Sequence, residues 1–399
     1  MIAIAGAGPA GLCVAFETAR AGLETVVVEK GAAVGIPLRT SGGSWIDELA
    51  ALGVPERFYV PIRRIRVIGP QAESGFDFET PRMCVLDVRR FYQWLAERAL
   101  DAGAELRLET RAEATIGDAG RPEGLRIRSR NGRFEDIRAR VVVDATGYPS
   151  ALTRRANLHA GFAAFGVGVE FDLHAPQFDT HEALLIVGRE LAPCGYAWAF
   201  PYGERRVRLG VGVGRPHTDA DPGAFLDGIR ARVPALRSLA DAGPIEHHVG
   251  LIPLAAPRSV PLVQNRLVVA GDAAGQASSL VGEGIRYAMH AGHAAGAAIV
   301  AACRSRDVDD GALDAYPRAW QRRERNLRFA HQIYRRIVDY DDAAWNREIA
   351  QLERLTPDQF AQGLKGDFSL AWLFGVVPRY SGMLVPERLR AGVRRFARG

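Results

Sequence analysis

Lysine is nearly missing from this chain of 399 residues, in which only Lys30 and Lys365 occur. The basic charge, formally +5 at pH 7, therefore comes from arginine, which is scattered among many alanine and glycine residues. Proteins that bind nucleic acid usually cluster their cations on one face or along one helix. The scatter is instead in keeping with a GC-rich genome, so we expect no nucleic-acid partner.

Cysteine and long apolar runs are also scarce. The four cysteines, Cys13, Cys84, Cys194 and Cys303, lie far apart and form no C-x-x-C pair. This spacing argues against a disulfide framework and favours a reduced cytoplasm. No apolar run approaches the roughly 20 residues that a membrane span needs, and a strand predicted from residue 2 leaves no room for a secretion signal. We expect a cytoplasmic protein.

The clearest motif lies at the start of the chain. Ile2–Ala5 is an apolar run of strand length that leads into Gly6-Ala7-Gly8-Pro9-Ala10-Gly11, which has G-x-G-x-x-G spacing. In such a turn Gly6 makes the bend, Gly8 admits a pyrophosphate, and Gly11 allows close packing of the next helix. That helix, Leu12–Ala21, would direct its free N–H groups at phosphates.

An acidic residue ends the next predicted strand. Thr25–Val28 has the pattern of a buried strand, and Glu29 follows about twenty residues past the glycines, where a ribose needs a hydrogen-bond acceptor. Strand, turn, helix, strand and acid in this order predict a dinucleotide site. Its residues are Gly6, Gly8, Pro9, Ala10, Gly11, Glu29 and Lys30.

Two later stretches repeat the pattern of a buried strand before a glycine turn. Val141–Val143 precedes Asp144-Ala145-Thr146-Gly147, and Leu267–Ala270 precedes Gly271-Asp272. Asp272 can accept hydrogen bonds from ribitol or ribose hydroxyls, unless it only caps the next helix. The segment Gly282-Glu283-Gly284-Ile285 opens a helix whose N–H groups suit the electron-rich edge of a flavin. The predicted flavin contacts are Gly147, Gly271, Asp272, Gly282, Gly284 and Ile285.

Two arginines are candidates for phosphate contacts. Arg39 lies in the glycine-rich loop 31–43, which either passes along the cofactor or is a solvated connector. Arg90, or its neighbour Arg89, begins the predicted helix Val88–Ala102 and is either a phosphate ligand or an ordinary surface charge. We include Arg39 and Arg90 among the predicted cofactor residues.

An antiparallel sheet is predicted in the middle of the chain. Phe162–Phe171 alternates bulky residues with small or polar ones, and Ala183–Val187, Tyr196–Phe200 and Val207–Val213 follow at hairpin spacing. One face would pack on a core, while the other, rich in glycine, would be open to a ligand. Since no helix follows the glycines of the last strand, we expect no second nucleotide domain.

Within this sheet Tyr196, Trp198 and Phe200 alternate on one face. They form either an aromatic wall for an apolar substrate or part of the core. Proton donors available to a reaction include Tyr196, Cys194, Tyr287 and His290, and the sequence does not choose among them. The predicted catalytic set is Tyr196, Trp198, Tyr287 and His290, and the predicted substrate-binding set is Tyr196, Trp198 and Phe200. His290 and His293 lack a third ligand, so no metal is expected.

The last hundred residues are predicted to be helical, with Tyr316–Ile337 and Trp345–Leu355 as the main helices. Phe368–Val377 is an apolar patch too short to span a bilayer. Five arginines follow it: Arg388, Arg390, Arg394, Arg395 and Arg398. Such a patch either contacts a membrane surface to collect a lipid or packs on the core as a lid.

The three glycine motifs together resemble, in order, those of FAD proteins built like para-hydroxybenzoate hydroxylase. Within these proteins the chain is most similar to the geranylgeranyl reductase family, through Tyr196-Ala197-Trp198-Ala199-Phe200-Pro201 and the segment Gly282–Met289. The resemblance covers about residues 1 to 305. It implies reduction of isoprenoid double bonds by reduced FAD, with electrons from NAD(P)H or a small electron carrier. Family members often carry a cysteine-glycine pair in the loop that here reads Pro37–Gly43, without cysteine.

The predicted fold class is α/β: a Rossmann-like FAD-binding domain with an inserted antiparallel-sheet substrate domain and a C-terminal helical region. The FAD-binding domain would comprise residues 1–60, 88–155 and 255–305. The substrate domain would comprise strands from 61–87 and the sheet of 156–254, and the helical region residues 306–399.

Two other functions stay open. The first is an FAD-dependent aromatic monooxygenase, since the Y-x-W-x-F-P segment is also similar to the W-x-W-x-I-P segment of flavin halogenases. Halogenation itself is disfavoured, because those enzymes need a mid-chain lysine and none lies between Lys30 and Lys365. The second is a cyclase or isomerase that uses reduced FAD without net redox change.

Overall fold

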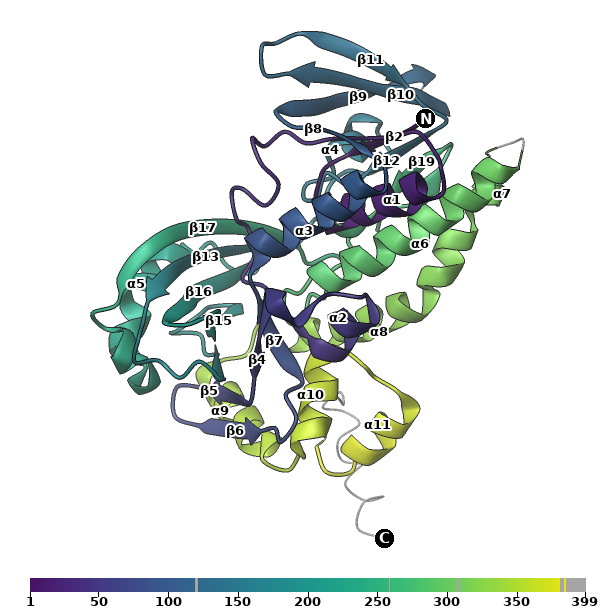
Figure 1. The fold of residues 1–399 in the computed structure, drawn as a ribbon. Helices are drawn as coiled ribbons and strands as arrows, with labels where there is room; N and C mark the ends of the chain where they lie inside the picture. Colours follow the sequence, from purple (N-terminus) through teal and green to yellow (C-terminus); the bar gives the residue numbers. More distant parts are fainter. Residues whose placement is uncertain (119–120, 258, 306–307, 309, 381–383, 385–399) are drawn as a thin grey trace.

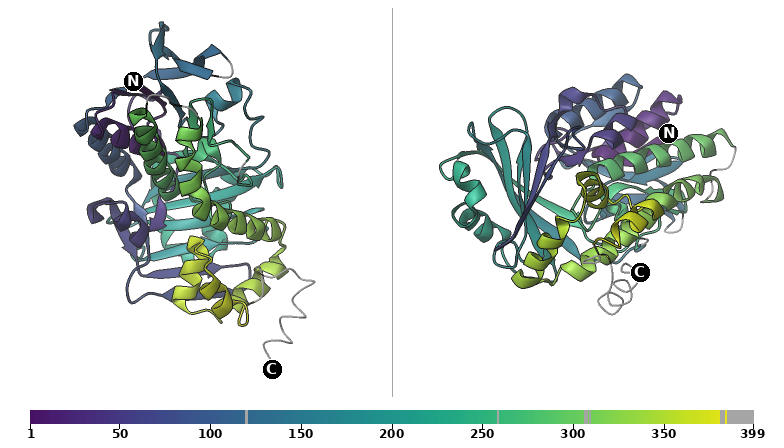
Figure 2. Two further views of the ribbon diagram at one scale, coloured as in Figure 1. Left: turned by 90° about the vertical axis from the view of Figure 1, so that its right-hand side faces the viewer. Right: turned by 90° about the horizontal axis from the view of Figure 1, so that it is seen from below.

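The computed structural model describes residues 1–118, 121–257, 259–305, 308, 310–380 and 384. It confirms the predicted fold class (Figures 1 and 2): a parallel sheet covered by helices, a large antiparallel sheet beside it, and a group of helices from the last part of the chain.

The first sheet has six strands and is parallel except at one edge. In spatial order they are β18 (Val263–Gln264), β19 (Leu267–Val269), β12 (Val141–Asp144), β1 (Ile2–Ala5), β2 (Thr25–Val28) and β8 (Glu105–Arg107). The residues of β1, β2 and β12 are all buried, as expected for parallel strands covered on both faces. In this order β19, β12 and β1, the three strands that lead into the glycine motifs, are neighbours.

Alternate residues of β1 face two different cores. Ile2 and Ile4 pack under the helices α1 (Pro9–Arg20), α3 (Val88–Asp101) and α6 (Ile285–Arg304). Ala3 and Ala5 face α4 (Ala151–Arg155) and a three-stranded sheet of β11 (Phe134–Arg138), β10 (Arg121–Ser129) and β9 (Thr110–Asp118). Neither β9 nor β11 contains an apolar run, so the sequence does not indicate these two strands.

The second large sheet has seven strands and is mostly antiparallel. Its order is β17 (Gly243–Pro253), β13 (Phe165–His174), β16 (Arg206–Arg215), β15 (Gly195–Pro201), β14 (Glu182–Ile186), β5 (Arg64–Ile68) and β6 (Glu73–Asp77). The predicted strands are confirmed, whereas β17 was not predicted, since polar residues and glycine interrupt its apolar residues. One face packs on α5 (Pro222–Arg232) and the 3₁₀ helix η2 (Pro234–Leu239).

A small sheet lies between these two. Its strands are β3 (Gly43–Trp45), β7 (Met83–Leu86) and β4 (Tyr59–Ile62), and it is accompanied by α2 (Ile46–Ala51) and the 3₁₀ helix η1 (Glu56–Phe58). Another 3₁₀ helix, η3 (Gly271–Ala274), follows β19. The sheets do not mark domain ends, so the predicted segment boundaries stay a prediction.

The last of the C-terminal helices lie on the side of β5 and β6, whereas the first two begin beside α6 (Figure 1). They are α7 (Asp310–Leu313), α8 (Ala315–Ile337), α9 (Asp342–Leu352), α10 (Pro357–Lys365) and α11 (Leu370–Val376). Residues of α8 to α11 form one core cluster with β5, β6 and β15. Among the described residues, no helix combines the length and apolarity needed to cross a bilayer. The five arginines that follow the apolar patch in the sequence, from Arg388 onward, lie outside the described residues.

Candidate functional site

The glycine turn after β1 has the geometry that its three glycines predict. A methyl group on Gly6 would lie 2.2 Å from the Ala145 carbonyl oxygen, and one on Gly11 would lie 2.0 Å from the Gly6 carbonyl oxygen. A methyl group on Gly8 would meet no atom within 4 Å. Gly6 and Gly11 are thus required by close packing, while Gly8 leaves free space at the start of α1. No side chain caps this helix end, so its N–H groups are available to an anion.

Glu29 lies directly after β2, as predicted. Its carboxylate accepts hydrogen bonds from the main-chain N–H groups of Ala7, at 3.0 Å, and Gly31, at 2.7 Å. These bonds hold the acid beside the glycine turn. Glu29 and Lys30 both border the same cavity as Gly6 and Gly8.

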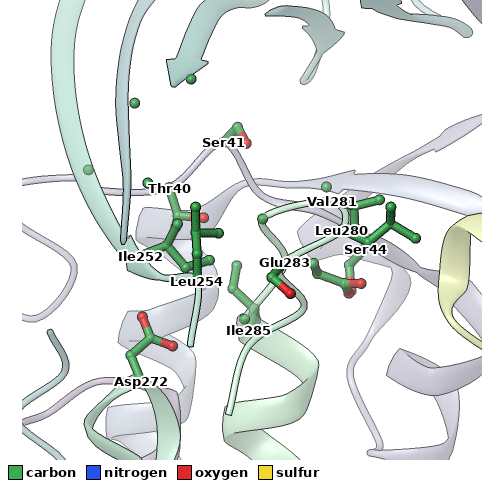
Figure 3. A pocket seen from close by; sticks show the side chains of 18 of the residues that line it. Thr40, Ser41, Ser44, Ile252, Leu254, Asp272, Leu280, Val281, Glu283 and Ile285 are labelled. Carbon is green, nitrogen blue, oxygen red and sulfur yellow. The ribbon is translucent and has the colours of Figure 1, made fainter. Parts of the chain in front are cut away.

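The glycine turn after β19 lies near the turn after β1, because only β12 separates these two strands. Asp272 lies in η3, and Gly284 is the first residue before α6, whose N-terminus also has no side-chain cap. Burial raises the pKa of the Asp272 carboxyl to about 6. Asp272 does not cap α6. Figure 3 shows Asp272, Glu283 and Ile285 around the pocket together with Thr40 and Ser41.

One cavity of about 740 Å³ joins these features. Of the predicted cofactor residues, those on its wall are Gly6, Gly8, Pro9, Ala10, Glu29, Lys30, Arg39, Gly147, Gly271, Asp272, Gly282, Gly284 and Ile285. Gly11 lies behind the wall, in keeping with its packing role. Because the residues come from widely separated parts of the chain, the two glycine motifs and loop 31–43 form one site.

The glycine-rich face of the antiparallel sheet forms another wall. Trp198 lies flat on it: a methyl group on Gly210 would be 2.3 Å from Cζ2 of the indole, and one on Gly212 would be 3.3 Å from Cζ3. Tyr196, Trp198 and Phe200 all border the cavity, and their rings follow one another along β15 at centroid distances of 5.5 and 6.4 Å. The aromatic stripe is therefore both cavity wall and core.

A hydrogen bond connects this wall to the segment Gly282–Ile285. The Tyr196 hydroxyl donates to the main-chain carbonyl of Val281, directly before Gly282, at 2.5 Å. Loop 31–43 is fixed as well, since the buried guanidinium of Arg208 donates to the Ser41 carbonyl at 2.9 Å. The loop lies close over the sheet: a methyl group on Gly250 would lie 2.2 Å from the Arg39 carbonyl oxygen. Arg39 therefore lies in a loop that follows the cavity.

The C-terminal helices supply a part of the cavity that was not predicted. The apolar lining residues from these helices include Ile333, Ile337, Ile349, Leu352, Phe360, Phe368 and Trp372. Their helical periodicity was visible in the sequence, but an apolar stripe that faces a cavity looks the same as one that faces a core. Phe368–Val377 is thus partly a cover, with its inner face on the cavity.

Three predicted site residues lie elsewhere. Arg90 is exposed and pairs with Asp87. Tyr287 and His290 do not border the cavity, because Ile285 and Ala288 occupy the side of α6 that faces it. The Tyr287 hydroxyl accepts from Arg286 at 2.8 Å, and His290 pairs with Glu48 at 2.5 Å. Their predicted roles therefore do not carry over to this site.

A cluster of metal-ligand type lies at the edge of the sheet. Donor atoms of Asp172, Glu246 and His248 lie within 4.8 Å of one another. However, Arg208 donates to Asp172 at 2.9 Å and Arg89 to Glu246 at 2.7 Å. Both carboxylates already have cationic partners, so we interpret the cluster as an ion network, buried at Asp172 and partly exposed at Glu246, that holds Arg208 in place.

Comparisons with known proteins agree with this geometry. The model of the FAD binding domain family matches residues 1–330. Digeranylgeranylglycerophospholipid reductase 1 of Methanopyrus kandleri is 30% identical over 325 residues, which cover 80% of this chain and 85% of that protein. The chain belongs to the geranylgeranyl reductase family of FAD-dependent oxidoreductases. It is therefore a flavin enzyme.

Solved structures confirm the fold of this family member. A geranylgeranyl bacteriochlorophyll reductase-like protein from Thermoplasma acidophilum superposes with a TM-score of 0.84 at 22% identity, covering 98% of both chains. A flavin-dependent brominase superposes with a TM-score of 0.72 at 18% identity, covering 100% of this chain and 98% of the brominase. At such identities the likeness concerns the fold alone.

The residues present fit FAD. The uncapped N-terminus of α1 and the open space at Gly8 suit a pyrophosphate. The uncapped N-terminus of α6 suits the edge of a flavin, and the half-buried acids Glu29 and Asp272 suit hydroxyl groups. The bound cofactor would supply hydride chemistry, and the protein supplies the apolar wall against which an acceptor is placed.

Proposed function

We propose that this enzyme reduces carbon–carbon double bonds in the isoprenoid chain of a lipid of geranylgeranyl type. The observation that carries the proposal is the continuity of the cavity, which extends from the glycine turns to the apolar helices α8 to α11. A long apolar chain needs such a lining, whereas a small aromatic substrate would not need the C-terminal part. The name of the M. kandleri relative supports the same substrate class.

The proposed roles follow from position. Gly8 and the N-terminus of α1 bind the pyrophosphate, Glu29 the ribose, and Asp272 with the Gly282–Ile285 segment the flavin side. Trp198 and Phe200 hold the alkene, and Tyr196 fixes the wall to the flavin segment. These residues orient the acceptor and exclude water.

The proposed electron source is NAD(P)H or a reduced electron carrier that meets the flavin directly. Gly210, Gly212 and Gly214 lie inside β16, and no helix follows them at the spacing of a nucleotide turn. A separate nicotinamide domain is therefore not part of the proposal.

An anaerobic experiment tests the reaction. The bound flavin is reduced, candidate isoprenoid lipids are added, and the absorbance of oxidised flavin and the product mass are followed. The proposal expects reoxidation together with a product heavier by two hydrogen atoms. Reoxidation only after oxygen is admitted would favour the monooxygenase, and a product of unchanged mass would favour the cyclase or isomerase.

We also propose that α11 rests on a membrane surface while it collects the lipid. Its inner residue Trp372 borders the cavity, whereas Leu370 and Phe374 on its outer side are 73% and 78% exposed. Two large apolar side chains one helical turn apart, next to the cavity, suit shallow insertion among lipid head groups. A cytoplasmic location is consistent with this peripheral contact and stays a prediction.

Vesicle flotation tests this contact. The double variant Leu370→Ser/Phe374→Ser should float less than wild type with phosphatidylglycerol–phosphatidylcholine vesicles and keep its flavin. Phe134→Ser is the matched control, because Phe134 is 59% exposed on β11 at the opposite end of the molecule (Figure 1). Equal flotation of wild type and the double variant would refute the contact.

A further inference from the structure

Reduction of an alkene by hydride leaves one carbon that needs a proton, so the proposed function requires an acid at the cavity wall. Tyr196 and Cys194 border the cavity, but their hydrogens are directed to main-chain carbonyls of Val281 and His217. Burial raises the pKa of both side chains above its usual range. They are poor donors in this arrangement.

The other acids on the wall differ in their partners. Glu283 forms a buried ion pair with Arg286, with Oε1 and Nε 2.7 Å apart. Glu348 accepts hydrogen bonds from Tyr340, at 3.3 Å, and Tyr380, at 2.8 Å, at the end lined by the C-terminal helices. Asp272 lies in the flavin motif. None of these three lies on the sheet that carries the aromatic wall.

Glu170 is different. It lies on β13, on the glycine-rich face beside Gly168, and is only 4% exposed. Its Oε2 accepts a hydrogen bond from the Trp198 indole N–H at 3.1 Å. Its Oε1 is buried and has no hydrogen-bond partner within the part of the chain that the structure describes. An ionised carboxylate would not normally leave a buried oxygen unpaired, so this environment favours the neutral acid, on a side chain that borders the cavity.

The charges around Glu170 come from three strands. Burial raises the pKa of the carboxyl above its usual range, and Arg208 on β16 and His248 on β17 act in the opposite direction. Asp172, on the same strand, raises the pKa further, and the Trp198 hydrogen bond lowers it. Burial is the largest of these effects. After proton loss, the indole N–H and Arg208 would stabilise the carboxylate.

We propose that Glu170 is the proton donor of the alkene reduction, an inference that rests on the proposed function. One alkene carbon receives the hydride that reduced FAD supplies. The O–H bond of Glu170 breaks, and the electron pair of the alkene forms a C–H bond to that proton at the neighbouring carbon. The flavin ends oxidised by two electrons, and the Glu170 carboxylate regains a proton from solvent.

Single-turnover kinetics with reduced enzyme test this role. Glu170→Gln should slow reoxidation by the alkene by about 10²- to 10⁴-fold, the usual contribution of a general acid. Flavin content, substrate Kd and reoxidation by oxygen should stay at wild-type values. The wild-type rate should fall as pH rises through the pKa of the acid, and this fall should be absent from Glu170→Gln. Tyr334→Phe is the control, because the Tyr334 hydroxyl is also buried, unpartnered and on the wall.

Infrared spectroscopy gives a second readout that does not depend on turnover. The carbonyl stretch of a protonated carboxyl group should be present in wild-type holoenzyme at neutral pH, absent from Glu170→Gln and present in Tyr334→Phe. An ionised Glu170, or a Glu170→Gln variant that reduces the alkene at the wild-type rate, would overturn the assignment while the reductase proposal stands. If Glu170→Gln does not fold, Glu170→Asp decides: a slower rate that still falls at high pH supports the role, and a wild-type rate refutes it. A wild-type enzyme that reduces no alkene would instead refute the proposed function.

Discussion

The hydroxyl of Tyr196 donates a hydrogen bond to the Val281 carbonyl, and this bond joins the substrate wall to the segment that precedes α6. The two residues are far apart in the chain: Tyr196 lies on β15, and Val281 lies in the turn before α6. The position of the aromatic wall relative to the flavin segment therefore depends on a contact that neither motif contains by itself.

Tyr196→Phe should leave the Val281 carbonyl without its partner. Loss of one partner of a buried hydrogen bond costs about 1–3 kcal/mol, so we expect a lower free energy of unfolding and faster flavin loss on dilution. Denaturant titration and flavin fluorescence measure these effects. Tyr59→Phe, a half-buried tyrosine on β4 away from the cavity, is the control. Flavin release at the wild-type rate would show that the bond does not fix the segment.

Gly8→Ala and Gly11→Ala should separate cofactor binding from folding. The Gly8 methyl group meets no protein atom, so the apoprotein should keep its stability within about 0.5 kcal/mol while FAD binding weakens strongly. The Gly11 methyl group would overlap the Gly6 carbonyl, and such overpacking typically costs about 1–3 kcal/mol. Thermal unfolding of both apoproteins and the flavin content of both purified variants test this contrast. If the Gly8→Ala variant binds FAD with wild-type affinity, the pyrophosphate does not bind at Gly8.

The sequence predicted the parts of the site that depend on local spacing. The turn at Gly6 and the strand ends at Glu29 and Asp272 are set by short-range rules of glycine and strand periodicity. Alternation along Phe162–Phe171 even placed Glu170 on the glycine-rich face, although nothing in the sequence distinguished it from a solvated acid. Its proposed role depends on burial and on the neighbouring Trp198, which only the tertiary structure brings beside it.

From the sequence, two residues were also misplaced and two features of the site were missed, and each error has a physical cause. Tyr287 and His290 follow the flavin segment closely in sequence, but the rotation of α6 turns them away from the cavity while Ile285 and Ala288 face it. The lining from α8 to α11 was missed because amphipathic periodicity does not reveal what an apolar stripe packs against. The Arg208–Asp172 pair was missed because charged residues in a strand usually face solvent.

Asp272 should stabilise bound FAD at the expense of the apoprotein. Its carboxyl has a pKa of about 6 in the folded protein, above the ordinary value of 3.8. The folded state thus binds more protons than the unfolded state between these values, and apoprotein stability falls as pH rises through this window. Asp272→Asn should remove that fall and be more stable than wild type at pH 7, yet lose FAD more readily. Unfolding of both apoproteins from pH 4 to 7 and equilibrium dialysis of FAD measure the two effects. A variant with unchanged FAD affinity would contradict the assigned contact.

The absence of a side chain at Gly210 allows Trp198 to lie on the sheet. Trp198 in turn holds the Glu170 carboxyl through a hydrogen bond. A methyl group on Gly210 would be 2.3 Å from Trp198 Cζ2 and 2.8 Å from Glu170 Cβ, so Gly210→Ala must displace the indole. We expect normal flavin content, because the glycine turns are untouched, but alkene reduction at least about tenfold slower, since small misplacements at a reacting centre are costly. Gly168→Ala is the matched control on the neighbouring strand, because its methyl group would lie 3.5 Å from Trp198 Cη2, an ordinary contact. If Gly210→Ala and Gly168→Ala reduce the alkene equally fast, the indole does not position the substrate, and the wall formed by β15 is only core.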